Sequence, residues 1–340
     1  MLKEILYRIQ QEKQLKDLPR PCDIFDLAGG TSTGGYVIGF VFEHKIISSI
    51  RLIVVMLFRL RMSVDQAIDA YERLAKGVFS SPKWFFKEGK FKASRLEEAI
   101  ATVIQEALNI GEGESSTLCM LEEEGAKWYG LLLHLSSHPL SHIYLSFVCA
   151  MPAGNFGFPS LFRSWIPIAN QAYNCTIVEA IRATTAAPTF FKAIEFGEPI
   201  KQSYHDGALG CNNPTKYVIE EAKFLFPNRP VSCILSLGTG VADIVGLDRP
   251  NAFQRVSPTR LIKVLKGIAT DCEKPSEGIA RDAAQSFLYC RLSVDQGIQQ
   301  VSPGGWEQLD KVQSHTLQYL RKHEIGQKID WLVQVLKGAP

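Results

Sequence analysis

The chain has 340 residues, enough to bury a substantial core as one large α/β domain or as two small ones. Charged residues make up only 21% of it and the formal net charge is +2, so no strong field marks a surface for polyanions, and nucleic acid is not an expected partner. The eight cysteines are scattered, with no C-x-x-C pair, which predicts buried free thiols in a reducing compartment.

The N-terminal stretch Met1–Lys16 is charged and has a helical apolar pattern, but it lacks the apolar core of a secretory signal. The most apolar region, Tyr36–Leu60, is interrupted by charged residues between 43 and 51, whereas a spanning helix needs roughly 20 mostly apolar residues. We therefore expect no transmembrane segment and a cytoplasmic location, at most peripheral at membranes.

Short apolar runs predict strands over Ile24–Ala28, Tyr144–Ala150 and Ser232–Leu237, each close to a turn signal or a glycine. The strand candidates alternate along the chain with segments of helical pattern. Such alternation favours an α/β fold over a bundle or a sandwich.

Helix starts are marked by three hydroxyl-x-x-Glu/Gln sequences, Ser63–Gln66, Ser94–Glu97 and Thr176–Glu179, which have the form of a capping box. Composition predicts polar loops at Asn109–Ser116 and near Gly240–Ser257.

Further helices are expected over Arg260–Ala269 and Gln308–Leu336, the second broken near Gly326. No repeat period or low-complexity tract is present. The last third of the chain is therefore interpreted as helical completion of one domain.

A G-x-S-x-G sequence, Gly30–Gly34, directly follows the first predicted strand. A sharp strand-to-helix turn needs small residues at these positions and would lift the hydroxyl of Ser32 clear of the backbone. The backbone N–H of Thr33 would then lie near a helix N-terminus, where it could stabilise an oxyanion.

The alternative is that this sequence is a plain glycine-rich turn or a phosphate cradle. A P-loop would require lysine after the last glycine, where Tyr36 stands, and the dinucleotide spacing G-x-G-x-x-G is absent, so no nucleotide cofactor is expected.

A serine nucleophile needs a base. Three of the seven histidines recur every four residues, at His134, His138 and His142, but Pro139 argues against a continuous helix there. No cysteine or carboxylate set has ligand spacing, so no metal site is expected. Asp206 ends an apolar segment and precedes a glycine that permits close backbone approach. Taken alone, an Asp-Gly pair is more often a turn.

Together, residues 26–35 (DLAGGTSTGG) and Asp206-Gly207-Ala208 resemble the two-part signature of patatin-like phospholipases, most closely the fungal members. The resemblance extends over residues 61–65, 90–94, 182–191 and 236–240 and covers most of the chain from Met1 to about Gln318. It implies a patatin-like phospholipase domain over 1–222, with 223–340 adding a strand and helices to the same domain.

This family implies a three-layer α/β fold whose central, mostly parallel sheet is flanked by helices, and a catalytic dyad in place of a triad. By motif position, Ser32 would attack an ester carbonyl and Asp206 would take its proton, since a carboxylate held dry beside a hydroxyl can have a raised pKa. Around them stand the motif residues Gly30, Thr31, Thr33, Gly34, Gly207 and Ala208.

The implied substrates are acyl esters of phospholipids and related lipids, cleaved in lipid catabolism with transient contact to a membrane surface. No cofactor or metal is implied. Phe190 and Phe191 are candidate pocket residues, although adjacent aromatics are more often plain core. The oligomeric state stays open.

Two departures from the family pattern stand out. Members usually carry a D-G-G-G-x-R-G stretch whose backbone N–H groups build most of the oxyanion hole, and it is not found here. Met1–Leu6 resembles the helix that follows that stretch, so the fold is expected to lack its first strand. Tyr36–Arg51 and Lys127–Leu145 do not resemble the family, and we interpret both as translated introns or other gene-model errors.

Two rival interpretations remain at this point. One is a catalytically weak or dead patatin-like module with a regulatory or recognition role in a larger fungal protein, favoured by the missing glycine-rich strand. The other is an ordinary α/β-hydrolase that uses Ser32 and Asp206 with His315 or His323, in that fold's chain order of serine, acid and histidine.

Overall fold

A computed structural model describes residues 1–31, 50–82, 89–122, 145–167, 173–188, 190–238, 272–283, 286–297 and 306–338. Its helices and strands in chain order are α1 (Leu2–Lys13), β1 (Leu27–Gly30), α2 (Ile50–Val54), α3 (Val64–Phe79), α4 (Ala93–Leu108), α5 (Glu112–Thr117), β2 (Leu145–Pro152), β3 (Ser160–Arg163), α8 (Ile177–Thr184), β4 (Ile194–Phe196), β5 (Gln202–Asp206), α9 (Thr215–Leu225), β6 (Cys233–Leu237), α11 (Glu273–Ala283), β7 (Leu288–Leu292), α12 (Leu309–Leu320) and α13 (His323–Gly338). A π-helical segment, Val55–Arg59, directly continues α2.

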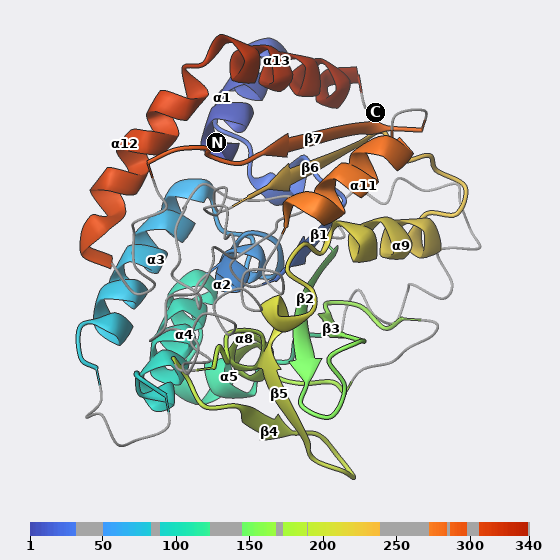
Figure 1. The fold of residues 1–340 in the computed structure, drawn as a ribbon. Helices are drawn as coiled ribbons and strands as arrows, with labels where there is room; N and C mark the ends of the chain where they lie inside the picture. Colours follow the sequence, from blue (N-terminus) through green and yellow to red (C-terminus); the bar gives the residue numbers. More distant parts are fainter. Residues whose placement is uncertain are drawn as a thin grey trace, which may run out of the picture.

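Strand β2 lies at the centre of the main sheet, and all eight of its residues are buried (Figure 1). It pairs in parallel with β1 and antiparallel with β3 and β5, and β4 extends the sheet beyond β5. A separate two-stranded sheet joins β6 and β7 in parallel. The α/β fold is confirmed, but the described pairings are mixed instead of mostly parallel, because β3, β4 and β5 belong to hairpin-like connections that return the chain against β2.

The register places β1 and β5 on the same edge of β2. Ala150 pairs with Ser160 of β3 and also with Asp206 of β5, so β3 and β5 occupy opposite edges. Val148 likewise pairs with β3 and with Gly30 of β1, so β1 also lies opposite β3. The ends of β1 and β5 therefore approach each other along one edge of β2, separated by the level of a single residue.

Helices cover both faces of this region. Successive residues of a strand face opposite sides of the sheet. A Cβ built on Gly29 would lie 2.6 Å from Cγ2 of Val218 in α9, and one built on Gly30 would lie 3.1 Å from Cγ2 of Val54 in α2. Helices α9 and α2 thus sandwich β1, and glycine at both positions provides the space. This arrangement confirms the three-layer architecture.

Two of the three predicted capping boxes are confirmed, at Ser63 of α3 and Thr176 of α8. The third prediction was wrong by two residues, because α4 begins at Ala93 and Ser94 lies inside it. Glu97 is instead engaged by the buried guanidinium of Arg182, whose Nε donates to Oε1 at 2.9 Å. Tertiary pairing therefore takes the side chain that a local cap would have used.

Two further local predictions need correction. The expected loop at 109–116 contains most of α5, whose hydroxyls bond back to carbonyls one turn earlier, such as Ser115 to Glu112. The C-terminal helical region breaks at residues 321–322, and Gly326 lies inside α13. The break lets one face of α13 pack on α1 and the second sheet, and Lys322 at the turn pairs with Asp295 at 2.5 Å.

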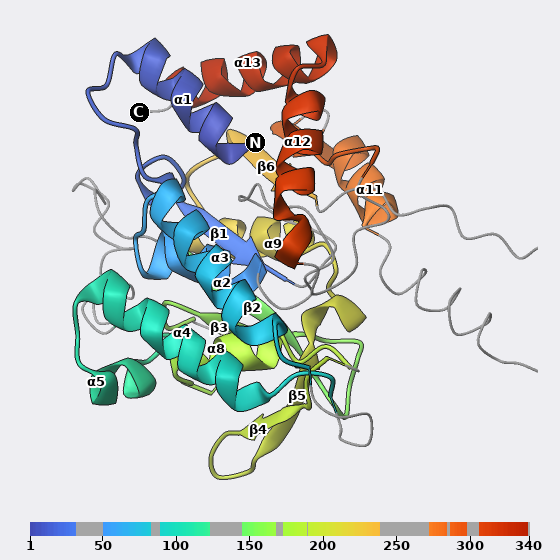
Figure 2. The same ribbon diagram turned by 90° about the vertical axis from the view of Figure 1, so that its left-hand side faces the viewer.

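Helix α1 lies beside α13, far from the β4–β5 hairpin (Figure 2). The predicted loop Gly240–Ser257 and the predicted helix Arg260–Ala269 lie outside the described residues. So do residues 36–49 and 127–144, which make up most of the two segments that do not resemble the family. Among the helices that the structure describes, none is both long and apolar enough to span a membrane. The boundary at 222/223 stays a prediction.

A buried ion pair fastens α9 to the sheet. Arg163 of β3 donates from Nε and Nη2 to the two carboxylate oxygens of Glu221 at 2.8 and 2.6 Å, and the two side chains are only 5% and 12% exposed. We expect Glu221→Gln to lower the free energy of unfolding by about 3–5 kcal/mol, because it removes the carboxylate charge that the buried guanidinium faces. Urea unfolding measures this. The double variant Arg163→Met/Glu221→Leu should cost clearly less, and an equal cost would contradict the explanation.

Candidate active site

The two motifs singled out in the sequence come together where β1 and β5 meet. Ser32, Thr33 and Gly34 lie outside the described residues, so the site is built from Gly30 and Thr31 on one side and from the turn after Asp206 on the other. Thr31 is fully buried. It is the chain neighbour of Ser32, and adjacent Cα atoms are about 3.8 Å apart.

Asp206 is the last residue of β5 and is only 1% exposed. Its Oδ1 accepts a hydrogen bond of 2.7 Å from the N–H of Ala208, so the carboxylate caps the short 3₁₀ turn Gly207–Leu209. Its own N–H donates to the carbonyl of Ala186 at 3.1 Å. The Asp-Gly pair is therefore a turn, and the same turn holds a desolvated carboxylate in one orientation.

Gly207 brings the second motif against Thr31 of the first. A Cβ built on it would lie 2.5 Å from the carbonyl oxygen of Cys149 and 2.9 Å from Oγ1 of Thr31. No side chain fits there, so glycine is required for space. The prediction that this glycine permits close backbone approach is confirmed, and the residue next to Ser32 lies against the residue next to Asp206.

The end of α8 supports this contact from behind. The hydroxyl of Thr184 donates to the carbonyl of Cys149, and Thr185 donates to Ile181 at 2.7 Å; both threonines are fully buried. With Ala186 accepting from Asp206, α8 holds both β2 and β5 at the level of the site. Sequence reasoning assigned these threonines no role, although adjacent hydroxyls at the end of an apolar helix were a usable signal.

Two phenols near the site are unsuited to act as the base. Burial raises the pKa of Tyr217 on α9, with smaller contributions from Cys211 and Cys149, and burial also raises the pKa of Tyr204 on β5. Both therefore stay protonated near neutral pH. Asp206 remains the candidate proton acceptor in this part of the structure.

The described histidines are distributed over distant elements. His205 precedes Asp206, and its ring centroid lies 6.0 Å from that of Phe156. His315 of α12 lies against Gly297 beyond β7, and His323 begins α13. His134, His138 and His142 lie outside the described residues.

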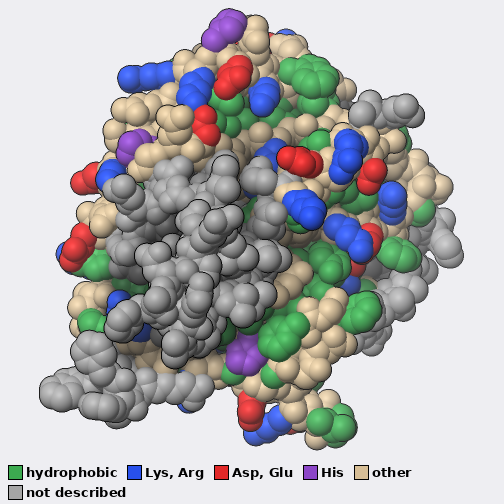
Figure 3. Space-filling view, in the orientation of Figure 1, with side chains coloured by type: hydrophobic (Ala, Val, Ile, Leu, Met, Phe, Trp, Pro, Cys, Tyr) green, Lys and Arg blue, Asp and Glu red, His purple; other side chains and the backbone are tan. Residues whose placement is uncertain are grey.

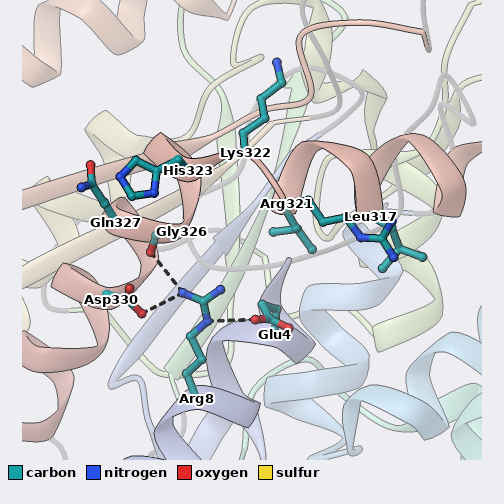
Figure 4. Close-up of a pocket in the computed structure, with 10 residues that line it drawn as sticks. Glu4, Arg8, Leu317, Arg321, Lys322, His323, Gly326, Gln327 and Asp330 are labelled. Carbon is teal, nitrogen blue, oxygen red and sulfur yellow. Dashed lines mark hydrogen bonds and ion pairs between the residues drawn. The ribbon is translucent and has the colours of Figure 1, made fainter.

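His323 lines a groove between α1 and the α12–α13 turn (Figure 4). Within it, Arg8 donates to Glu4 at 2.8 Å, to Asp330 at 2.7 Å and to the carbonyl of Gly326 at 3.1 Å. These contacts join the first and last helices of the described chain. The groove is thus a charged junction between helices and contains neither motif.

All eight cysteines are free thiols, and five are buried. Burial raises the pKa of Cys22 and of Cys233 to about 11, and that of Cys290 to about 12. These three are poor nucleophiles at neutral pH. Within the described ranges, no group of three or more acidic, histidine or cysteine side chains is arranged to hold a metal ion.

The candidate pocket residues have different surroundings. Phe191 is 2% exposed and packs with Phe79 and Phe91, their ring centroids 6.2 and 6.0 Å from its own. It belongs to the core between α3 and α8, so the plain-core alternative holds for it. Phe190 is half-buried beside Phe91 and stays a candidate.

The family model described as "Patatin-like phospholipase" matches residues 9–219, more than half of the chain. This range includes both motifs and every described element from β1 to β5.

Similar curated proteins come from animals and plants. The chain is 30% identical over 162 residues to "Calcium-independent phospholipase A2-gamma" of Rattus norvegicus, covering 46% of this chain and 19% of that protein. It is 24% identical over 260 residues to "Phospholipase A I" of Arabidopsis thaliana, an alignment that covers 64% of this chain and 18% of that protein. It is 34% identical over 100 residues to "Patatin-like protein 3" of Arabidopsis thaliana, covering 24% and 23%.

The alignments span less than a quarter of each of these relatives. The special likeness to fungal members stays a prediction, since these relatives are animal and plant proteins.

The close approach at Gly207 yields a direct test. We expect Gly207→Ala to lower the free energy of unfolding by about 1–3 kcal/mol, because the new methyl group would overlap the Cys149 carbonyl and the Thr31 hydroxyl. Urea unfolding followed by circular dichroism measures the change. Gly154→Ala is the matched control, since a Cβ there meets no atom within 4 Å. Equal stability of the two variants would contradict the packing described here.

Proposed function

Because the chain belongs to the patatin-like phospholipase family, we propose that it is a serine acyl hydrolase that cleaves lipid acyl esters, with Ser32 as nucleophile and Asp206 as proton acceptor. The observation that carries this proposal is the contact between the two motifs, in which Thr31 lies against Gly207. Each of these residues is one peptide unit from a proposed catalytic residue.

The strand register supports the same pairing. Strand β1 ends at Gly30 opposite Val148, and β5 ends at Asp206 opposite Ala150, on the same edge of β2. An extended chain continuing two residues past Gly30 would reach the level of Ala150, which Asp206 already occupies. A sharp turn after Gly30, as a G-x-S-x-G motif provides, resolves that conflict.

The proposed chemistry proceeds in two halves. The hydroxyl oxygen of Ser32 attacks the ester carbonyl carbon while its proton passes to the Asp206 carboxylate. The tetrahedral intermediate then expels the alcohol, which takes that proton, and an acyl-serine ester remains. Water, deprotonated by the same carboxylate, attacks this ester and releases the fatty acid and the serine hydroxyl, which regains its proton.

The surroundings of Asp206 suit this role. Burial removes competing water, and the hydrogen bond that the N–H of Ala208 donates to Oδ1 helps to orient the carboxylate. For the oxyanion we propose the backbone N–H of Thr33, because a donor at a helix N-terminus stabilises developing negative charge.

Substitution of the two proposed catalytic residues tests the mechanism. We expect Ser32→Ala to abolish both labelling by a fluorophosphonate probe and hydrolysis of a p-nitrophenyl acyl ester. Asp206→Asn keeps the shape of the side chain but removes the base, so turnover should fall about 10²- to 10⁴-fold. Gel fluorescence measures the labelling, and absorbance of released nitrophenolate measures turnover.

The controls address the rival interpretations. His315→Ala and His323→Ala should both turn over ester like the unsubstituted chain, and loss of activity in either would favour a histidine-containing triad. Labelling that persists in Ser32→Ala would refute the assignment of the nucleophile. A folded wild-type chain that neither labels nor hydrolyses would favour a non-catalytic recognition module.

A metal requirement separates this mechanism from metal-assisted hydrolysis. The similar rat protein is named calcium-independent, and a Ser-Asp dyad supplies both nucleophile and base from the protein itself. We therefore expect ester hydrolysis to be unchanged after treatment with EDTA and after later addition of Ca²⁺. Loss of turnover that Ca²⁺ restores would contradict the dyad as a complete mechanism.

A further inference from the structure

Two hairpin tips project from the end of the sheet that carries the candidate active site. One is the β2–β3 connection, residues 153–159, and the other is the β4–β5 turn, residues 197–201. Pro152 pairs with Tyr204, and the N–H of Ala153 donates to the carbonyl of Ser203 at 2.8 Å, so both tips begin at the same level of the sheet. Figure 1 shows the β4–β5 hairpin at the extremity of the molecule.

Large apolar side chains are exposed on both tips. Phe158 is 75% exposed and Phe156 is 48% exposed on the first, and Ile200 is 82% exposed on the second. We call these three residues the hairpin-tip patch. Figure 3 shows hydrophobic side chains on the lower half of this face, separated by other side chains. Single exposed apolar residues are ordinary, but grouped ones beside a site indicate a binding surface.

The patch is continuous with the Asp206 turn. A Cβ built on Gly210, just after that turn, would lie 2.6 Å from the carbonyl oxygen of Phe156. The Phe156 ring also lies 6.0 Å from the ring of His205, the residue before Asp206. Phe156 therefore lies beside the end of β5, which carries Asp206, and beside the turn that follows it.

The charge of the tips is balanced. Residues 153–159 contain no charged side chain, and in 197–201 the acidic Glu198 is offset by Lys201. Tips without net charge are not attracted electrostatically to an anionic lipid surface. A zwitterionic surface would take up their apolar side chains without an electrostatic cost.

We propose that the hairpin-tip patch docks the protein on a zwitterionic phospholipid surface by inserting Phe158 and Ile200 among the lipids. The inference rests on the proposed function, because a lipid-ester hydrolase has to reach substrates that are packed in such a surface. Insertion removes the side chains from water, and complete burial of one large apolar side chain strengthens binding by roughly a factor of 10 or more. Phe156 stays between the inserted residues and the Asp206 turn.

Co-sedimentation with phosphatidylcholine vesicles tests the proposal in a Ser32→Ala background, which prevents consumption of the lipid. We expect Phe158→Ser/Ile200→Ser to lower the partition coefficient by about 10-fold or more. The matched control is Phe224→Ser/Leu317→Ser, which removes side chains that are 71% and 56% exposed on α9 and α12. It should bind like the parent chain.

Two further measurements address folding and charge. All variants should show the same thermal unfolding by circular dichroism, and Ile200→Trp, which adds an aromatic ring suited to the lipid interface, should bind more tightly than the parent. Binding should be equal at low and high salt, because no net charge is involved.

Several outcomes would overturn the proposal. One is an equal loss of vesicle binding in Phe158→Ser/Ile200→Ser and in Phe224→Ser/Leu317→Ser. Another is the absence of vesicle binding by the parent chain, and a third is binding that needs anionic lipid and disappears in high salt. Self-association that the hairpin-tip pair abolishes would assign the patch to a second copy of the chain. The binding assay needs no turnover, so failure of the wild-type chain to hydrolyse ester would count against the proposed function alone.

Discussion

One constraint organises the candidate site, namely that β1 and β5 share a single edge of β2 and approach along it from opposite directions. Two strands cannot occupy the same stretch of edge, so each has to leave the sheet where they meet. The residues at this junction are small for that reason, and Gly207 has room for no side chain between Thr31 and the carbonyl of Cys149. Thr31 and Asp206 are 175 residues apart in the sequence (206 − 31), and the pairing of their strands with β2 brings them together.

Buried polar contacts keep this junction rigid. Behind it, α8 donates from Thr184 to β2 and accepts from Asp206 through Ala186. Across the sheet, the Arg163–Glu221 ion pair joins β3 to α9, the helix that covers Gly29. Desolvated hydrogen bonds and charges of this kind specify a unique arrangement because leaving any one of them unpaired is costly. A reactive carboxylate held in one orientation benefits from such surroundings.

The molecule also separates its two ends. The first and last described helices, α1 and α13, lie together, and Arg8 joins them through an ion pair with Asp330 and a hydrogen bond to the carbonyl of Gly326. The proposed catalytic junction and the hairpin-tip patch lie toward the β4–β5 end (Figures 1 and 2). A lipid surface docked at the tips would therefore leave the junction of α1 and α13 facing away from it.

Local chemistry was enough to predict much of this chain from its sequence. The apolar runs of β2 and β6 and the capping boxes at Ser63 and Thr176 follow from residue type and spacing, which act over a few neighbouring residues. The first strand was predicted at 24–28 but lies at Leu27–Gly30. The pairing of the motifs at 26–35 and 206–208 came from the family resemblance. What failed depended on distant partners. Glu97 caps no helix because the buried Arg182 takes its carboxylate, and the C-terminal helices part at 321–322 because α13 packs on α1 and the second sheet. The mixed direction of the sheet and the contact of Thr31 with Gly207 were decided only by the tertiary structure, because strand register joins residues that the sequence holds far apart.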